Sequence, residues 1–169
     1  APPLDEQKRI VALLDAATAR VTELAACYEQ ARTHANDLFT SALCYELESN
    51  PDWPVKALGH LMTVQNGYAF DSQYFSPSGK IGLIRIRDLK GGHGTETHFV
   101  GPYDDEYVVN AGDYLIGMDG EFRCYEWKGD SALLNQRVCR LRDFGKSLDA
   151  RFLFYGINKL LKEIEDVTG

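Results

Sequence analysis

The opening of this 169-residue chain lacks the residues that interrupt helices. Neither glycine nor proline occurs between Leu4 and Asn50, whereas Pro2 and Pro3 come directly before that stretch. The sequence therefore predicts one helix that begins at the prolines and runs without a break. At 1.5 Å per residue such a helix is about 60 Å long. It would overhang a domain built from the rest of the chain, whose radius of gyration would be only ~14 Å.

Cysteine is scarce, and its spacing excludes a structural zinc site. The four cysteines form no CxxC pair and lie among apolar neighbours, which predicts reduced thiols in a cytoplasmic protein. No apolar run approaches the ~20 residues of a membrane span, and no signal peptide is present, so we expect no membrane partner. The four positions are Cys27, Cys44, Cys124 and Cys139.

Basic residues are fewer than acidic ones. The chain has 18 lysines and arginines against 25 aspartates and glutamates, for a formal net charge of −7. This balance argues against a protein that coats nucleic acid non-specifically, but it leaves room for a local basic patch.

Within the long predicted helix, apolar and small residues recur with steps that alternate between four and three. This heptad pattern favours a helix partner over a helix that lies on the core of its own domain. We therefore predict a homodimer through this surface, here called the seam. Its predicted contact residues are Ile10, Leu14, Ala17, Val21, Leu24, Tyr28, Ala31, Ala35 and Leu38.

Beyond the helix the composition changes to one rich in glycine, aromatic and β-branched residues. The helix boundary is expected near Asn50-Pro51. Residues 80–89 alternate isoleucine with arginine, which predicts a strand with one polar face. Asp119-Gly120 predicts a hairpin turn. The predicted fold is α+β, with a helix at 1–47, a β-rich domain at 48–150 that includes strands in 106–127 and 133–142, and a helical exit at 151–169.

Basic and polar residues gather in this β-rich region, around a glycine-rich loop. Such side chains contact phosphates and base edges in duplex DNA. An ordinary solvated strand face would show the same Arg-x-Arg alternation, so spacing alone does not decide between them. The candidate DNA-binding residues are Lys80, Arg85, Arg87, Lys90, His93, Thr95, Arg123 and Lys128.

A small magnesium-dependent nuclease is the alternative enzyme hypothesis. Asp119 precedes Glu126-Trp127-Lys128, and two acidic ligands with a nearby lysine are typical of such sites. Chance explains a three-residue match in an acid-rich chain, and Asp119 has a plain role in the turn. A third hypothesis is a coiled-coil module that binds protein alone. No nucleophile elbow or phosphate-binding glycine loop is present.

Several segments together resemble the specificity subunits of type I restriction-modification systems. "PPLDEQKRIVALLD" (2–15) resembles the start of their conserved spacer helix. The segments that follow in the order of that family are "DWPVKALGHLMTVQNGYAF" (52–70), "IGLIRIRDL" (81–89), "VVNAGDYLIGMDGEF" (108–122), "LLNQRVCRLR" (133–142) and "FLFYGINKLLKEIEDVTG" (152–169).

The resemblance implies a DNA-recognition subunit that is not an enzyme and needs no cofactor or metal. In that family two target recognition domains alternate with two helices that pair antiparallel, and each domain reads one half-site of double-stranded DNA. Partner modification and restriction subunits methylate and cleave. With one helix and one domain, this chain is expected to be a fragment or a half-subunit that must dimerise. The matching framework residues are Gly67, Tyr68, Phe70, Gly112, Asp113 and Gly120, with Asn135, Gln136 and Arg137 in a recurring motif.

Overall fold

The computed structural model describes residues 1–49, 52–120 and 122–168. Asn50 and Pro51, where the sequence predicts the helix boundary, lie outside the described residues. The chain divides into two compact units, Ala1–Asp52 and Trp53–Gly169. No helix in the described ranges combines the length and the apolar character that a membrane crossing requires.

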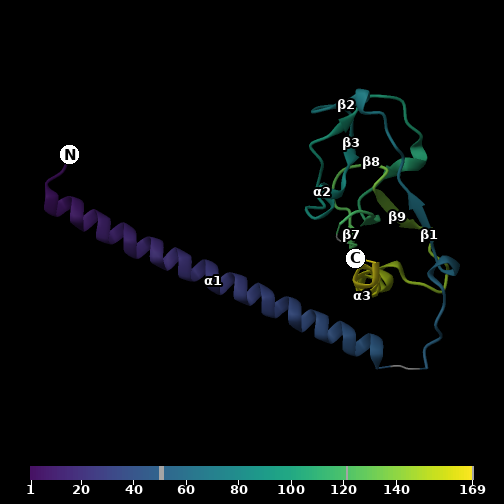
Figure 1. The fold of residues 1–169 in the computed structure, drawn as a ribbon, viewed down its shortest axis with the longest axis horizontal. Coiled ribbons are helices and arrows are strands. Elements are labelled where there is room, and N and C mark those ends of the chain that lie inside the picture. The colour runs from purple at the N-terminus through teal and green to yellow at the C-terminus, as the bar shows by residue number, and fades with distance from the viewer. Residues whose placement is uncertain (50–51, 121, 169) are drawn as a thin grey trace. The chain divides into compact units, whose positions relative to one another are not determined.

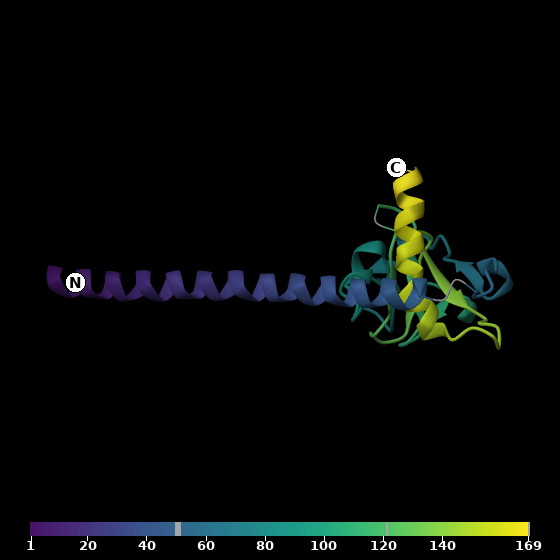
Figure 2. The ribbon, with the colours of Figure 1, turned by 90° about the horizontal axis from the view of Figure 1, so that it is seen from below.

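The first unit is the single helix α1, Leu4–Glu48, which runs unbroken for 45 residues (Figures 1 and 2). Asp5 and Glu6 lie in its first turn, where acidic side chains suit the helix dipole. The prediction of a long helix is therefore confirmed. In the described part of this unit no second helix or strand covers the seam, whose large side chains are exposed by between 37% at Ile10 and 73% at Leu38.

The second unit contains two sheets. A four-stranded antiparallel sheet has the order β1-β9-β6-β7, and a five-stranded mixed sheet has the order β2-β4-β3-β8-β5. The strands are β1 Thr63–Asn66, β2 Phe75–Ser76, β3 Ile81–Ile84, β4 His98–Phe99, β5 Val108–Val109, β6 Tyr114–Gly117, β7 Cys124–Glu126, β8 Ala132–Leu134 and β9 Val138–Arg142. Three single turns of 3-10 helix lie at Leu58–His60, Ser72–Tyr74 and Asp105–Tyr107.

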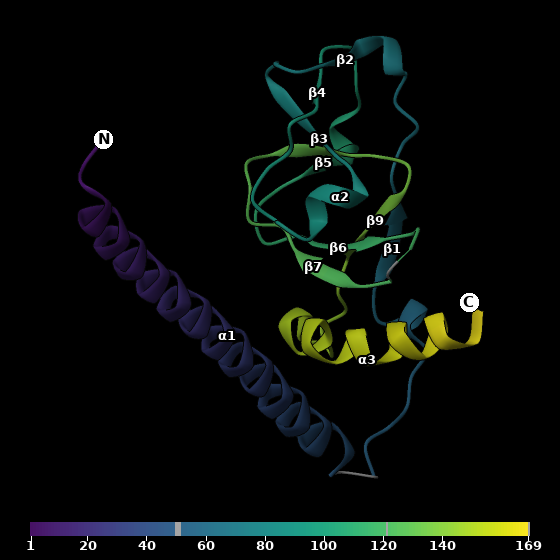
Figure 3. The ribbon, with the colours of Figure 1, turned by 60° about the vertical axis from the view of Figure 1, so that its left-hand side comes forward.

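Helix α3, Ala150–Thr168, covers one face of the four-stranded sheet (Figure 3). Leu153 and Ile157 pack there against Ile116, Cys139 and Leu141. The opposite face packs against the five-stranded sheet and the short helix α2, Ile86–Leu89, in a second apolar cluster. The helix that the sequence predicts after Gly145 is thus confirmed, and it forms part of the core of this unit.

The packing of elements on both faces of a sheet explains why some strands show no alternation of apolar and polar residues. In β8 all three residues are buried, because Leu133 faces one apolar cluster while Ala132 and Leu134 face another. A strand buried on both faces reads as a continuous apolar run. Residues 133–142, predicted as one strand, are therefore two strands in different sheets. The chain turns at Asn135, whose carbonyl accepts a hydrogen bond from the Val138 amide at 2.9 Å.

The predicted strand at 80–89 is also shorter than expected. It ends at Ile84, and the Asp88 carboxylate then accepts a hydrogen bond from the Arg85 amide at 2.9 Å. This contact caps α2, so the alternation of isoleucine and arginine continues into a helix. By contrast, the hairpin predicted at Asp119-Gly120 is confirmed, with Tyr114 opposite Glu126 and Ile116 opposite Cys124.

Gly67 is one of the framework residues that the resemblance identifies, and the structure shows why this position has to be glycine. A Cβ atom at this position would lie 2.0 Å from the carbonyl oxygen of Asn135, so a side chain has no room. The close approach lets the Gly67 amide bond to the Val138 carbonyl at 2.9 Å and the Tyr68 amide to the Leu134 carbonyl at 3.0 Å. The chain after β1 is thereby joined to both β8 and β9.

Candidate nucleic-acid interface

Helix α2 presents two of the predicted DNA-binding residues. Leu89 is 2% exposed and anchors the helix in the core between the sheets. Arg87 and Lys90, on the same short helical segment, are exposed. Both line a small hollow of about 190 Å³ that also involves Tyr125 of β7. The basic side chains of α2 therefore lie beside the β6–β7 hairpin.

The glycine-rich loop after α2 is held by backbone contacts. The Gly92 amide donates to the Asp88 carbonyl at 3.0 Å, and the Lys128 amide donates to the Gly92 carbonyl at 2.7 Å. Gly92 has a φ of +65°, a left-handed conformation that suits glycine. These bonds place the loop against the turn that follows β7.

The glycine-rich loop and the turn after β7 also approach each other closely at Gly129. A Cβ atom at Gly129 would lie 2.8 Å from the backbone of His93 and the ring of Trp127. The turn thus fits against the loop because position 129 carries no side chain. The structure brings Lys90, His93 and Lys128 together on this surface, with Arg87 on the adjoining helix. Arg123, which is exposed, directly precedes β7 and therefore lies at the end of that strand opposite to Lys128.

Three other predicted residues are placed differently. Lys80 precedes β3, at the end of the strand opposite to α2. The half-buried Arg85 has its guanidinium carbon 5.7 Å from the centre of the Phe75 ring. Thr95 uses its hydroxyl internally, since it donates to the Leu83 carbonyl at 2.9 Å and accepts from the Thr97 amide at 3.1 Å. Arg87, Lys90, His93 and Lys128 remain together as candidate DNA-binding residues, and this set is called the DNA face.

The nuclease residues do not assemble. Asp119 lies at the tip of the hairpin and pairs with Arg137 at 2.7 Å, whereas Glu126 lies opposite Tyr114 at the far end. Across residues 1–49, 52–120 and 122–168, no three His, Cys, Asp or Glu side chains are grouped so that they could hold a metal ion. The geometry gives the alternative hypothesis no support.

The buried cysteines of this unit are poor nucleophiles. Burial raises the pKa of the Cys124 thiol to about 12, and it also raises the pKa of the Cys139 thiol. The thiolate is the reactive form, so both groups stay protonated and inert near neutral pH. Their position against α3 gives them a packing role.

Arg140 is an organising residue that the sequence analysis missed. Its side chain is buried, and it donates to Gln65 Oε1 at 2.6 Å, the Val108 carbonyl at 2.6 Å and the Glu106 carbonyl at 2.9 Å. It also pairs with Asp113 at 3.2 Å. A basic residue inside the apolar run 138–141 is the signal that could have identified it, since buried charges require partners.

Comparison with known proteins identifies the family. The family described as "Type I restriction modification DNA specificity domain" matches residues 50–169. The chain belongs to this family. It is 33% identical over 123 residues to the specificity subunit of the type I restriction enzyme EcoBI from Escherichia coli. That alignment covers 72% of this chain and 26% of the EcoBI subunit.

Solved structures of type I proteins share the fold. The HsdS subunit from Thermoanaerobacter tengcongensis is 25% identical with a TM-score of 0.60, over 96% of this chain and 43% of that one. A chain from work on complex assembly and conformational transition of the type I R-M system matches with 25% identity and a TM-score of 0.62, over the same shares of the two chains. The specificity subunit from M. genitalium is 17% identical with a TM-score of 0.55, over 96% and 44%, and shows the fold alone. The chain thus spans less than half of each of these relatives.

Proposed function

We propose that the second unit reads one half-site of a bipartite sequence in double-stranded DNA, as part of a non-catalytic type I specificity subunit. The observation that carries this proposal is the DNA face. This proposal is supported by the backbone contacts of α2, the glycine loop and the turn at 127–129, which hold the segments that carry Arg87, Lys90, His93 and Lys128 next to one another. A local concentration of positive charge on an acidic chain attracts a polyanionic ligand such as DNA.

The test uses the chain assembled with its modification subunit. Duplexes that the complex retains from a random-sequence pool are expected to share a half-site. Replacing Arg87, Lys90 or Lys128 with alanine should weaken binding, and each lost phosphate contact should lower the slope of log affinity against log salt by about one. Lys80→Ala is the matched control, because Lys80 lies outside the DNA face. Failure to enrich any sequence, or equal effects of Lys80→Ala and Lys90→Ala, would contradict the proposal.

We further propose that the seam of α1 pairs with a second helix, in this chain a second copy. Leu14, Val21, Leu24 and Leu38 are each at least 59% exposed, although they share one helical face. Burial of such side chains is worth roughly 1.5–3 kcal/mol each, so an uncovered seam favours association. The antiparallel pairing implied by the family would place Leu14 beside Leu38 of the other helix.

The pairing is tested with two variants on opposite sides of the helix. Leu24→Asp puts a charge into the seam and should lower the dimer fraction in sedimentation equilibrium at least roughly tenfold. Ala26→Asp, two residues away on the outer face, should leave the dimer unchanged. In a background with serine at the free Cys27 and Cys44, oxidation of a variant with cysteine at both 14 and 38 should join position 14 of one chain to position 38 of the other, which a parallel pair would not do. A monomer at all practical concentrations would refute the proposal.

Membership of the family suggests two further protein partners, the modification and restriction subunits. We propose that the chain, in its native assembly, docks modification and restriction subunits that perform methylation and cleavage. The isolated chain should then cleave no duplex with Mg²⁺ or Mn²⁺. It should co-purify with the modification subunit when the two are co-expressed.

A further inference from the structure

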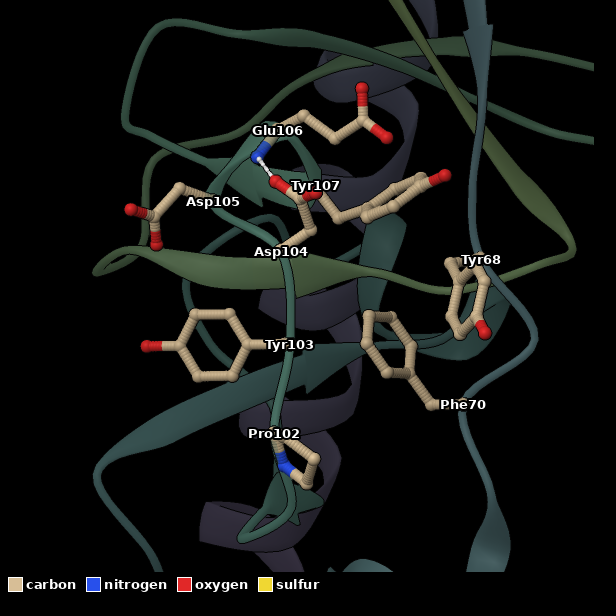
Figure 4. A pocket seen from close by; sticks show the side chains of 8 residues that line it. All are labelled: Tyr68, Phe70, Pro102, Tyr103, Asp104, Asp105, Glu106 and Tyr107. Carbon is tan, nitrogen blue, oxygen red and sulfur yellow. Dashed lines mark hydrogen bonds between the residues drawn. The ribbon is translucent and has the colours of Figure 1, made fainter.

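A cleft of about 680 Å³ lies on the second unit and shares no residue with the DNA face. Two segments line it: Tyr68–Phe70, which follows β1, and Pro102–Tyr107, which joins β4 to β5 (Figure 4). In Figure 4 Tyr68 and Phe70 lie on one side, while Tyr103 and Asp105 extend toward the other. The cleft thus has an aromatic side and a loop side that comes from a different part of the chain.

Aromatic rings form the wall of this cleft. The ring centres of Tyr68 and Tyr107 are 5.2 Å apart, and those of Tyr68 and Phe70 are 5.1 Å apart. Phe70 is buried at the base, whereas Tyr68 is 52% exposed and Tyr103 is 44% exposed. Tyr68 on the aromatic side and Tyr103 on the loop side are therefore both accessible to a ligand. Packing against Phe70 and Tyr107 fixes the ring of Tyr68 in advance.

The rim of the cleft is acidic. Asp104, Asp105 and Glu106 are consecutive, and none of the eight side chains drawn in Figure 4 is cationic. The Asp104 carboxylate also accepts a hydrogen bond from the Glu106 amide at 3.0 Å, and all three acidic side chains contribute to the rim. The negative rim repels the phosphates of nucleic acid and attracts a cation.

The rim is held from beneath by the Arg140 network. The Glu106 carbonyl accepts from Arg140 at 2.9 Å and from Gln65 Nε2 at 2.9 Å, and the Val108 carbonyl accepts from Arg140 at 2.6 Å. These bonds order the loop before any ligand arrives. A preformed site avoids part of the entropy cost of binding.

We propose that this cleft receives an arginine side chain from a basic segment of a partner protein. A guanidinium group is flat, stacks on tyrosine faces and pairs with carboxylates through a fork of donors. A lysine ammonium is a compact, strongly hydrated point charge and gains less from ring faces. The cleft combines both elements that arginine uses, exposed rings and carboxylates.

The experiment titrates the full-length chain with a short arginine peptide blocked at both ends, and follows the backbone amides of residues 103–107 by NMR. Saturable shifts at these amides are expected. A lysine peptide of equal length should bind more weakly, and a glutamate peptide should cause no shift. Tyr103→Ala and the nearly isosteric Asp105→Asn should each weaken arginine binding roughly three- to tenfold.

Glu96→Gln is the matched control, because it removes one exposed acid outside the cleft and should leave the affinity within a factor of about two. Unchanged melting temperatures will show that each variant is folded. Equal binding of arginine and lysine peptides, no saturation, or equal effects of Asp105→Asn and Glu96→Gln would overturn the proposal. Shifts of the same amides by a DNA duplex would assign the cleft to nucleic acid instead. These outcomes are separate from those of the DNA-face variants.

Discussion

Arg140 shows how a single buried charge connects separate parts of the recognition unit. It lies directly opposite Gln65 in the β1–β9 pair and opposite Leu115 in the β6–β9 pair. Its guanidinium group reaches past the sheet to the segment that contains Glu106 and Val108. A guanidinium has five donors in a rigid fork, so one side chain satisfies several acceptors that would otherwise be unpaired.

Replacing Arg140 with methionine should destabilise the unit by about 3 kcal/mol, because Gln65 Oε1 and the carbonyls of Glu106 and Val108 lose their donor. Urea unfolding followed by the fluorescence of the buried Trp127 measures this loss. Arg137→Met is the matched control. Its ion pair with Asp119 is exposed and should contribute about 0–1 kcal/mol. Equal losses in the two variants would contradict the role assigned to Arg140.

Among the elements, α2 depends on a small number of contacts. It is four residues long, too short to be stable without its cap and its buried anchor Leu89. The cap is the hydrogen bond from the Arg85 amide to Asp88. The orientation of Arg87 and Lys90 therefore depends on the carboxylate of Asp88 together with the anchor Leu89.

Asp88→Ala should lower the free energy of unfolding by about 1 kcal/mol through loss of the cap. It should also weaken DNA binding by the assembled complex, although an acidic residue normally repels DNA. Fluorescence anisotropy with a selected duplex measures the second effect. Glu96→Gln, which removes a neighbouring acid outside the helix, is expected to leave binding unchanged or slightly improved. Tighter binding by Asp88→Ala would show that the cap does not position the basic side chains.

The elements differ in how well the sequence predicts them. The absence of glycine and proline and the unbroken seam are sufficient to predict α1, because both signals are local. Asp119-Gly120 likewise predicts its hairpin. The division of residues 133–142 between two sheets was missed, because strands buried on both faces carry no period-two pattern. The turn at Asn135 depends on its contact with Gly67, which is distant in the sequence.

The candidate site was also predicted only in part, because its arrangement depends on the fold as well as on the types of its side chains. Side-chain chemistry identified basic residues within one stretch of sequence, and the structure brings Arg87, Lys90, His93 and Lys128 near each other. The separation of Lys80 from them and the internal bonding of Thr95 follow from the end of β3 at Ile84. That end is set by the cap between Arg85 and Asp88 and by packing of Leu89 in the core, and the alternation of isoleucine with arginine reveals neither.

At the scale of the whole molecule, the two units have different sources of stability. The second unit buries three apolar clusters of its own, whereas the large side chains of the seam in α1 remain exposed within a single chain. A long helix without tertiary packing is only marginally stable in water. The order of α1 should therefore depend on association, and that of the second unit should not.

Thermal unfolding of the intact chain should show two transitions. The helical circular dichroism signal should contain a step that moves to higher temperature as protein concentration increases, because association stabilises α1 by mass action. The near-ultraviolet signal of the buried Trp127 should report a second step that is independent of concentration. Leu24→Asp should shift the first step and leave the second in place. A single shared transition would show that the units unfold together.

The backbone bonds beneath the DNA face have a consequence for how such a protein changes its target. The contacts from Gly92 to Asp88 and from Lys128 to Gly92 use main-chain atoms, which are the same whichever side chain occupies positions 90, 93 and 128. In the proposed DNA face, substitutions at those three positions should therefore alter recognition without rebuilding the loop that displays them. We expect new specificities to be accessible through single replacements, each of which leaves a folded intermediate.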